Sequence, residues 1–131
     1  MLDLLIRRHA LSILEAAAAL APPYWATVER MKDESQKKHL QVLKIIYESA
    51  MLNGPFAVLA AFSGGMFSLT DNTKLRPMTA ATQDGYTYFA SELSALYEMQ
   101  EDLRQVITPR AGEPVVALFH KSSALSEGVV A

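Results

Sequence analysis

Apolar residues recur at helical spacing through the first 21 positions of the chain. Leu2, Leu5, Ile6, Ile13 and Leu14 fall on one side of a helix, and most of the charged residues fall on the other. This periodicity predicts an amphipathic helix over residues 2–21. The prolines at positions 22 and 23 end it, because proline has no backbone N–H to donate inside a helix.

Residues 23–53 carry a second helical pattern whose two halves differ. Met31 is the only apolar side chain in residues 29–38, whereas apolar side chains crowd residues 40–51. Two interpretations fit: one helix whose first half overhangs the core, or two helices split near Asp33, with Ser35 as a cap. Opposite charges four residues apart favour one continuous helix, and they occur as Arg30/Glu34, Asp33/Lys37 and Glu34/Lys38.

The motif Asn53-Gly54-Pro55 separates this pattern from a run without polar side chains, residues 56–62. Asn and Gly tolerate the left-handed backbone that closes a helix. Proline suits the first position of a new helix. The motif therefore predicts a helix boundary, followed by a short helix over residues 56–62 that is apolar on every side and buried in the core.

The second half of the chain begins with turn signals between Gly64 and Gly85. Two interpretations remain open there: a small hairpin within residues 66–78, or a plain loop that acts as a lid over a binding site. An apolar stripe then predicts a helix over residues 86–107. Residues 114–119 form an apolar patch, either a strand or a short helix, and residues 121–131 have the composition of a weakly ordered tail.

These elements predict a mainly α fold, a single-domain bundle of four or five helices. The helical domain is expected to span residues 1–120 and the tail residues 121–131. The apolar run 56–62 should lie near the centre of the bundle, and strands are the alternative only in residues 66–78 and 114–119.

Composition narrows the classes of function. The chain has 131 residues, 50% of them hydrophobic, no cysteine and a formal net charge of −2. Without cysteine it has no disulfide framework, thiolate zinc site or cysteine nucleophile. The net charge provides no general attraction for nucleic acid or anionic lipid. We expect a cytoplasmic protein without a membrane partner, because no window has the length of uncharged sequence that a membrane span needs.

No motif of a catalytic, cofactor or metal site is present in the sequence. The three histidines, at positions 9, 39 and 120, have no second ligand at metal spacing. The pair Gly64-Gly65 is not followed by the Gly-Lys-Ser/Thr of a phosphate-binding loop. We therefore predict that the protein is not an enzyme and uses no cofactor.

Two surfaces are candidates for contact with a partner. Arg30, Lys37 and Lys44 are spaced by seven residues, so on a continuous helix they form a basic stripe, with Lys38 nearby. Such a stripe can follow a phosphate backbone without reading sequence, and an ordinary solvated helix face is the alternative. The second candidate is a hydrophobic interface in residues 56–62, formed by Phe56, Leu59 and Phe62.

Several short motifs resemble the small helical subunit of type III CRISPR effector complexes. They are Arg7-Arg8 in the first predicted helix, Leu43-Lys44, Asn53-Gly54, and Leu59-Ala60 with Phe62. The similarity covers the first half of the chain, and the proline that usually precedes Asn-Gly in that family is absent. The resemblance implies a non-catalytic helical bundle that stacks along an RNA-guided assembly and contacts nucleic acid through basic surface residues.

The sequence thus favours a non-enzymatic helical subunit or adaptor that binds a protein partner or forms a homo-oligomer. The first alternative is a sequence-independent nucleic-acid contact through Arg30, Lys37, Lys38 and Lys44. The second is a small ligand-binding protein or enzyme in which residues 64–85 act as a lid over an apolar pocket.

Overall fold

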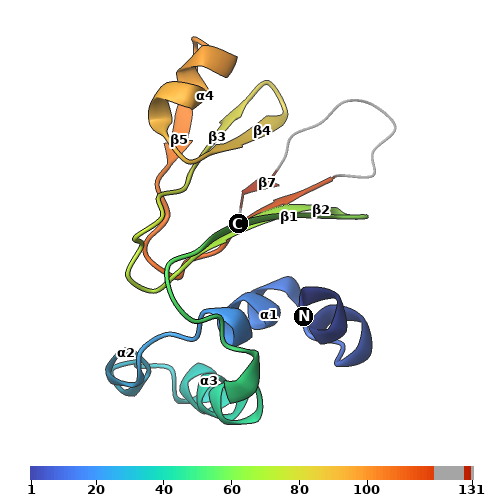
Figure 1. Cartoon of the computed structure of the whole chain (residues 1–131), viewed down its shortest axis with the longest axis vertical. Coiled ribbons are helices and arrows are strands. Elements are labelled where there is room, and N and C mark those ends of the chain that lie inside the picture. Colours follow the sequence, from blue (N-terminus) through green and yellow to red (C-terminus); the bar gives the residue numbers. More distant parts are fainter. Residues whose placement is uncertain (120–128, 131) are drawn as a thin grey trace.

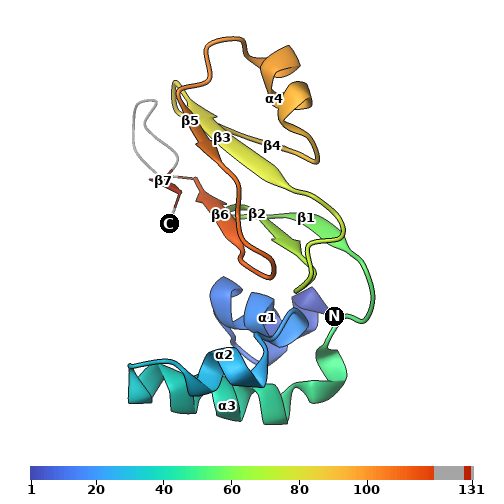
Figure 2. The same cartoon turned by 90° about the vertical axis from the view of Figure 1, so that its left-hand side faces the viewer.

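The computed structural model of the chain describes residues 1–119 and 129–130, and these residues form a mixed α/β fold (Figure 1). A layer of helices from the first 50 residues lies against one face of a four-stranded antiparallel sheet. A second, three-stranded antiparallel sheet with one helix lies beyond the first sheet (Figures 1 and 2). The predicted mainly α bundle is therefore wrong.

The helical layer consists of a five-residue π-helix η1 (Leu4–Arg8), α1 (Ile13–Leu20), α2 (Trp25–Glu29), α3 (Glu34–Ile46) and a 3-10 turn η2 (Glu48–Ala50). The predicted helix over residues 2–21 is thus divided. Ala10 has a φ of 56°, which a right-handed helix cannot contain. Ser12 then begins α1 with a capping box, in which the Ser12 hydroxyl and the Glu15 carboxylate each accept a hydrogen bond from the other's backbone N–H.

The prediction of one continuous helix over residues 23–53 is also wrong. Helix α2 ends at Glu29, and α3 begins at Glu34 after an intervening turn. Asp33 rather than Ser35 is the cap, because the Asp33 carboxylate accepts hydrogen bonds from the backbone N–H groups of Ser35 and Gln36 at 2.9 and 3.1 Å. An aspartate at this position satisfies free N–H groups of a new helix. This cap stabilises the break between α2 and α3, and the opposite charges four residues apart do not prevent it.

The first sheet has the order β1-β2-β6-β7, with β1 at Ala57–Phe62, β2 at Gly65–Thr70, β6 at Val115–Leu118 and β7 at Val129–Val130. The predicted helix over residues 56–62 is therefore a strand. Gly54 has the expected positive φ of 86°, but it turns the chain from the helical layer into the sheet. Ser63 and Gly64 form a two-residue turn that pairs β1 with β2 in antiparallel register.

The second sheet has the order β4-β3-β5, with β3 at Thr79–Gln83, β4 at Tyr86–Ala90 and β5 at Gln105–Ile107. Helix α4 (Leu93–Met99) packs on it through the fully buried Leu96. Asp84 and Gly85 both have positive φ, the geometry of a tight hairpin turn. The predicted helix over residues 86–107 is accordingly two strands around a two-turn helix. The hairpin predicted within residues 66–78 does not form, because β2 pairs with β1 and β6 and not with the residues that follow it.

The main core lies between the helical layer and the first sheet. Phe67 and Leu69 of β2 and Val116 of β6 share a cluster with three buried alanines and Leu20 of α1 and with Leu43 of α3. The cross-strand partners of Phe67 and Leu69 on β1 are Ala60 and Val58. Because side chains alternate along a strand, the even-numbered residues of β1 face the helices and its odd-numbered residues face away. The strand alternative for residues 114–119 is confirmed by β6, and the tail 121–131 lies outside the described residues except for β7.

Candidate functional site

The most distinctive surface of the chain is an apolar stripe on the outer side of α3. Val42, Ile45 and Ile46 are 53%, 67% and 63% exposed. Their spacing of three and four residues places them side by side on one face of the helix, whereas Leu43 points into the core. We call Val42, Ile45 and Ile46 the α3 surface. Contiguous exposed apolar groups of this kind mark interaction sites in soluble proteins.

A pocket adjoins the α3 surface where α2 and α3 meet. It has a volume of about 330 Å³ and includes Tyr24, Trp25, Lys44, Ile45 and Met51 in its lining. The Lys44 Nζ lies 4.3 Å from the centroid of the Trp25 ring and donates a hydrogen bond to the Pro23 carbonyl. Burial in this position lowers the pKa of the Lys44 ammonium group. The cation–π contact holds Trp25 in place beside exposed apolar side chains, which is how an aromatic anchor at an interface is preorganised.

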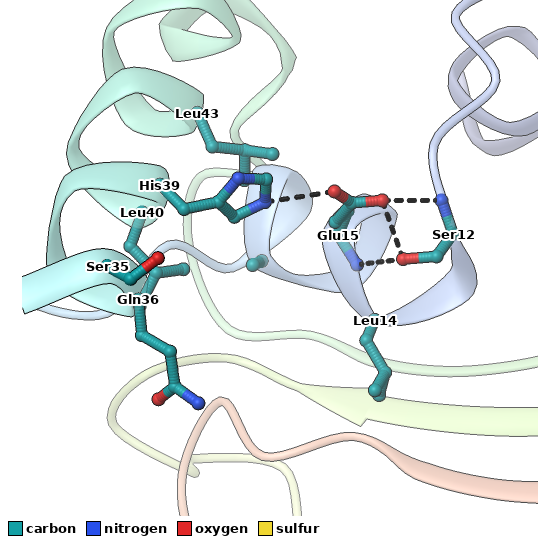
Figure 3. Close-up of a pocket in the computed structure, with 9 residues that line it drawn as sticks. Ser12, Leu14, Glu15, Ser35, Gln36, His39, Leu40 and Leu43 are labelled. Carbon is teal, nitrogen blue, oxygen red and sulfur yellow. Dashed lines mark hydrogen bonds and ion pairs between the residues drawn. The ribbon is translucent and has the colours of Figure 1, made fainter. Parts of the chain in front are cut away.

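A second hollow lies between α1 and α3 (Figure 3). It has a volume of about 710 Å³ and combines apolar side chains from both helices, such as Leu14 and Leu40, with a polar cluster. In that cluster the Glu15 carboxylate accepts hydrogen bonds from the Ser12 hydroxyl at 2.7 Å and from the His39 Nε2 at 2.9 Å. Hydrogen bonds from the Ser12 hydroxyl and backbone N–H, followed by the proximity of His39, lower the pKa of Glu15.

These three polar residues resemble a hydrolase triad in composition but not in connectivity. In a catalytic triad the histidine lies between the nucleophile and the acid, so that it can take the proton from the hydroxyl. Here Glu15 lies between Ser12 and His39. The Ser12 hydroxyl also accepts a hydrogen bond from the Glu15 backbone N–H at 3.2 Å and so caps α1. The arrangement therefore fixes the start of α1 and ties it to α3.

The basic residues singled out by the sequence do not form one stripe. Arg30 lies at the end of α2, and Lys37, Lys38 and Lys44 lie on α3, which begins after a turn. Lys37 pairs with Glu34 at 3.2 Å, and Lys44 is engaged with Trp25 and Pro23. The stripe required a continuous helix, and the turn at Asp33 removes that geometry. A contact between these residues and phosphate stays a prediction.

The predicted hydrophobic interface is divided between the two faces of the first sheet. Phe56 packs against the core beneath the helices, and Phe62 is half-buried on the same face. Leu59 points to the opposite face and is 47% exposed. Residues 64–85 are not a plain loop, because β2 and β3 occupy both ends of this range, and a lid role for them stays a prediction.

The sequence did not single out the α3 surface, although it contained a signal for it. Apolar residues from position 40 to 51 occupy more than one side of a helix, and the core accounts for only one of those sides. Within the described ranges, no three residues among His, Cys, Asp and Glu are grouped to hold a metal ion. In the same ranges, no helix combines the length and apolarity needed to cross a bilayer.

Comparison with known proteins gives one relative of the chain. An uncharacterised protein of Archaeoglobus fulgidus is 38% identical over 114 residues, which make up 87% of this chain and 30% of that protein. The chain therefore spans less than a third of the length of this relative. No family model matches the chain, and no solved structure matches it. Nothing in these comparisons bears on the resemblance to the CRISPR small subunit.

Proposed function

We propose that the chain is a protein-binding module whose apolar surfaces are covered by further polypeptide in a larger protein or assembly. The observation that carries this proposal is the α3 surface, where three aliphatic side chains are each more than half exposed on one helix face. Full burial of an exposed aliphatic side chain contributes roughly 1.5 to 3 kcal/mol of stability. A partner that covers the α3 surface would therefore gain part of this free energy at each of the three side chains. The role proposed is binding rather than catalysis.

The length of the archaeal relative supports the same proposal. About 70% of that protein lies outside the match with this chain, so the relative carries enough additional polypeptide to cover the α3 surface. The neighbouring Trp25 pocket adds tryptophan and tyrosine, the residue types that dominate the energetics of protein interfaces. The covering polypeptide is therefore expected to present an apolar face with side chains that fill this pocket.

Substitution Ile45→Glu tests the proposal in two settings. In the isolated chain the side chain is exposed, so the free energy of unfolding should change by no more than about 0.5 kcal/mol. In the full-length archaeal relative, glutamate at the aligned position should cost at least about 2 kcal/mol, because an unpaired carboxylate would lie beneath the covering polypeptide. Urea unfolding followed by circular dichroism measures both values.

Ser49→Glu is the matched control, because it adds the same carboxylate at an exposed position on the neighbouring turn η2. It should be neutral in the isolated chain and at the aligned position of the relative. If glutamate at the position of Ile45 is as harmless in the relative as this control, no polypeptide covers the α3 surface and the proposal fails.

A further inference from the structure

The outer edge of the first sheet is a second unpartnered feature. Strand β1 pairs only with β2 in the described part of the chain, and it lies at the margin of the sheet (Figure 2). An edge strand presents a row of backbone N–H and C=O groups that can pair with another strand. The next strand could therefore bond only to those residues of β1 whose backbone N–H and C=O groups point away from β2.

The hydrogen bonds of the neighbouring strands determine that direction. The Phe119 N–H donates to the Gly64 carbonyl at 2.8 Å. The backbone groups of Gly64 therefore point toward β6 and away from β1. Because these groups alternate along an antiparallel strand, Gly65, Phe67 and Leu69 must bond to β1. Their partners on β1 are Phe62, Ala60 and Val58, respectively.

A second hydrogen bond gives the same direction. The Asp71 N–H donates to the Phe56 carbonyl at 3.1 Å, so Phe56 also points its backbone toward β2, in step with Val58. The residues between these positions consequently direct their N–H and C=O groups away from the sheet. They are Ala57, Leu59 and Ala61, and they form what we call the β1 edge.

The β1 edge has none of the features that keep edge strands from pairing. Natural sheets protect their edges with charged side chains, proline or a bulge. Residues 57–62 contain neither a charge nor a proline, and the register from Ala57↔Thr70 to Phe62↔Gly65 runs without an extra residue. The exposed Leu59 also offers an apolar side chain to a neighbour on the outer face.

We propose that the β1 edge accepts an additional strand, supplied by an extended, uncharged, apolar segment of the polypeptide that covers this module. The proposal rests on the proposed function and specifies the mode of contact. The segment is assigned to the part of the longer protein outside the match, since this part makes up about 70% of the archaeal relative. Main-chain hydrogen bonds to Ala57, Leu59 and Ala61 provide the affinity, and Leu59 provides side-chain selectivity.

Hydrogen exchange measured by NMR tests the proposal without a substitution. In the isolated chain the amides of Ala57, Leu59 and Ala61 should exchange fast, whereas those of Val58, Ala60 and Phe62 should be protected by their bonds to β2. In the full-length archaeal relative the three aligned outward amides should slow by at least about 100-fold. Because the match covers 114 of the 131 residues, it includes this segment wherever it begins.

Substitution Ala61→Pro provides the second test, because proline removes the outward N–H and leaves the bonds to β2 intact. The variant should leave the urea midpoint of the isolated chain unchanged. Proline at the aligned position of the relative should lower its midpoint and return the two neighbouring outward amides to fast exchange. Serine at the same position keeps the N–H and is the matched control.

The outcomes separate this inference from the proposed function. If Ile45→Glu destabilises the relative but proline at the β1 edge does not, the module is covered and no strand is added, so the inference fails alone. Fast exchange of the outward amides in the relative overturns it as well. Protection that appears in the isolated chain as its concentration rises would assign the edge to a second copy and also overturn it.

Discussion

Replacing Phe67 with alanine is expected to lower the free energy of unfolding of the chain by about 3 to 5 kcal/mol. Phe67 is completely buried at the centre of the first sheet, with Ala60 and Val116 as its cross-strand neighbours. The helix that shares its core cluster contributes mainly alanines. Small neighbours cannot move far enough to fill the space that the ring leaves, so the cavity cost should be near the upper end of this range.

Such a loss is a large fraction of the stability of an ordinary domain, which is about 5 to 15 kcal/mol. Urea unfolding of the 131-residue chain, monitored by circular dichroism, measures it. Phe119→Ala is the matched control, because this phenylalanine is 69% exposed at the end of β6, and the expected change is within about 0.5 kcal/mol. Equal effects of the two substitutions would mean that the core does not lie between α1 and β2.

The elements that could be predicted from the sequence are those with a local cause. Pro22 ends α1 in the structure, because proline interrupts a helix wherever it occurs. One of the turn signals between Gly64 and Gly85 is the pair Asp84-Gly85, and both residues have positive φ in the structure. The helical pattern in the second half of residues 23–53 correctly indicated a helix, α3, and the structure shows Leu43 to be its buried residue.

The strands could not be predicted because their cause is not local. A short apolar run is compatible with a buried helix and with a strand, and periodicity alone does not separate them. Residues 57–62 become a strand because Gly65–Thr70 pairs with them on one side. Residues 115–118 then pair with Gly65–Thr70 from about 50 positions away. The prediction of a helix over residues 86–107 was wrong for the same reason, because β3 pairs with both ends of that range.

The candidate site could not be predicted from the sequence either. The sequence indicated a basic contact surface at Arg30, Lys37 and Lys44. In the structure, Lys44 instead contacts the ring of Trp25. Exposure of Val42, Ile45 and Ile46 depends on which face of α3 meets α1, and this packing is decided by tertiary contacts. Leu59 was the one member of the predicted hydrophobic interface that reaches the open face of the sheet.

Asp71 connects the segments that enter and leave the first sheet. One carboxylate oxygen accepts hydrogen bonds from the Thr73 hydroxyl at 2.5 Å, the Thr73 N–H at 2.9 Å and the Leu75 N–H at 3.3 Å. The other oxygen accepts from the Phe56 N–H at 3.3 Å, just before β1. The Asp71 carbonyl accepts from the Gly112 N–H at 3.2 Å, shortly before β6. Removing this carboxylate leaves four donors without a partner.

The Asp71→Asn variant is expected to be destabilised at neutral pH and to lose much of this difference in acid. The Thr73 hydroxyl, followed by the backbone N–H groups of Thr73, Leu75 and Phe56, lowers the pKa of Asp71 below its ordinary value of 3.8. A depressed pKa contributes stability that is present above the unfolded value and is lost as the pH falls through the folded value. The gap between wild type and variant should therefore be constant above about pH 5 and narrow below pH 3.8.

Urea midpoints of both proteins between pH 7 and pH 2.5 test this expectation, and Thr73→Val provides the discriminating control. Because the Thr73 hydroxyl is the largest cause of the lowered pKa, its removal should raise the folded pKa of Asp71 toward 3.8 and reduce the acid-dependent part of the stability. In the Asp71→Asn background the same substitution should leave the pH dependence unchanged, since no carboxylate remains there to titrate. If the difference in urea midpoint between wild type and Asp71→Asn is the same at every pH, the charge of the Asp71 carboxylate does not strengthen the hydrogen bonds of this turn and the prediction is wrong.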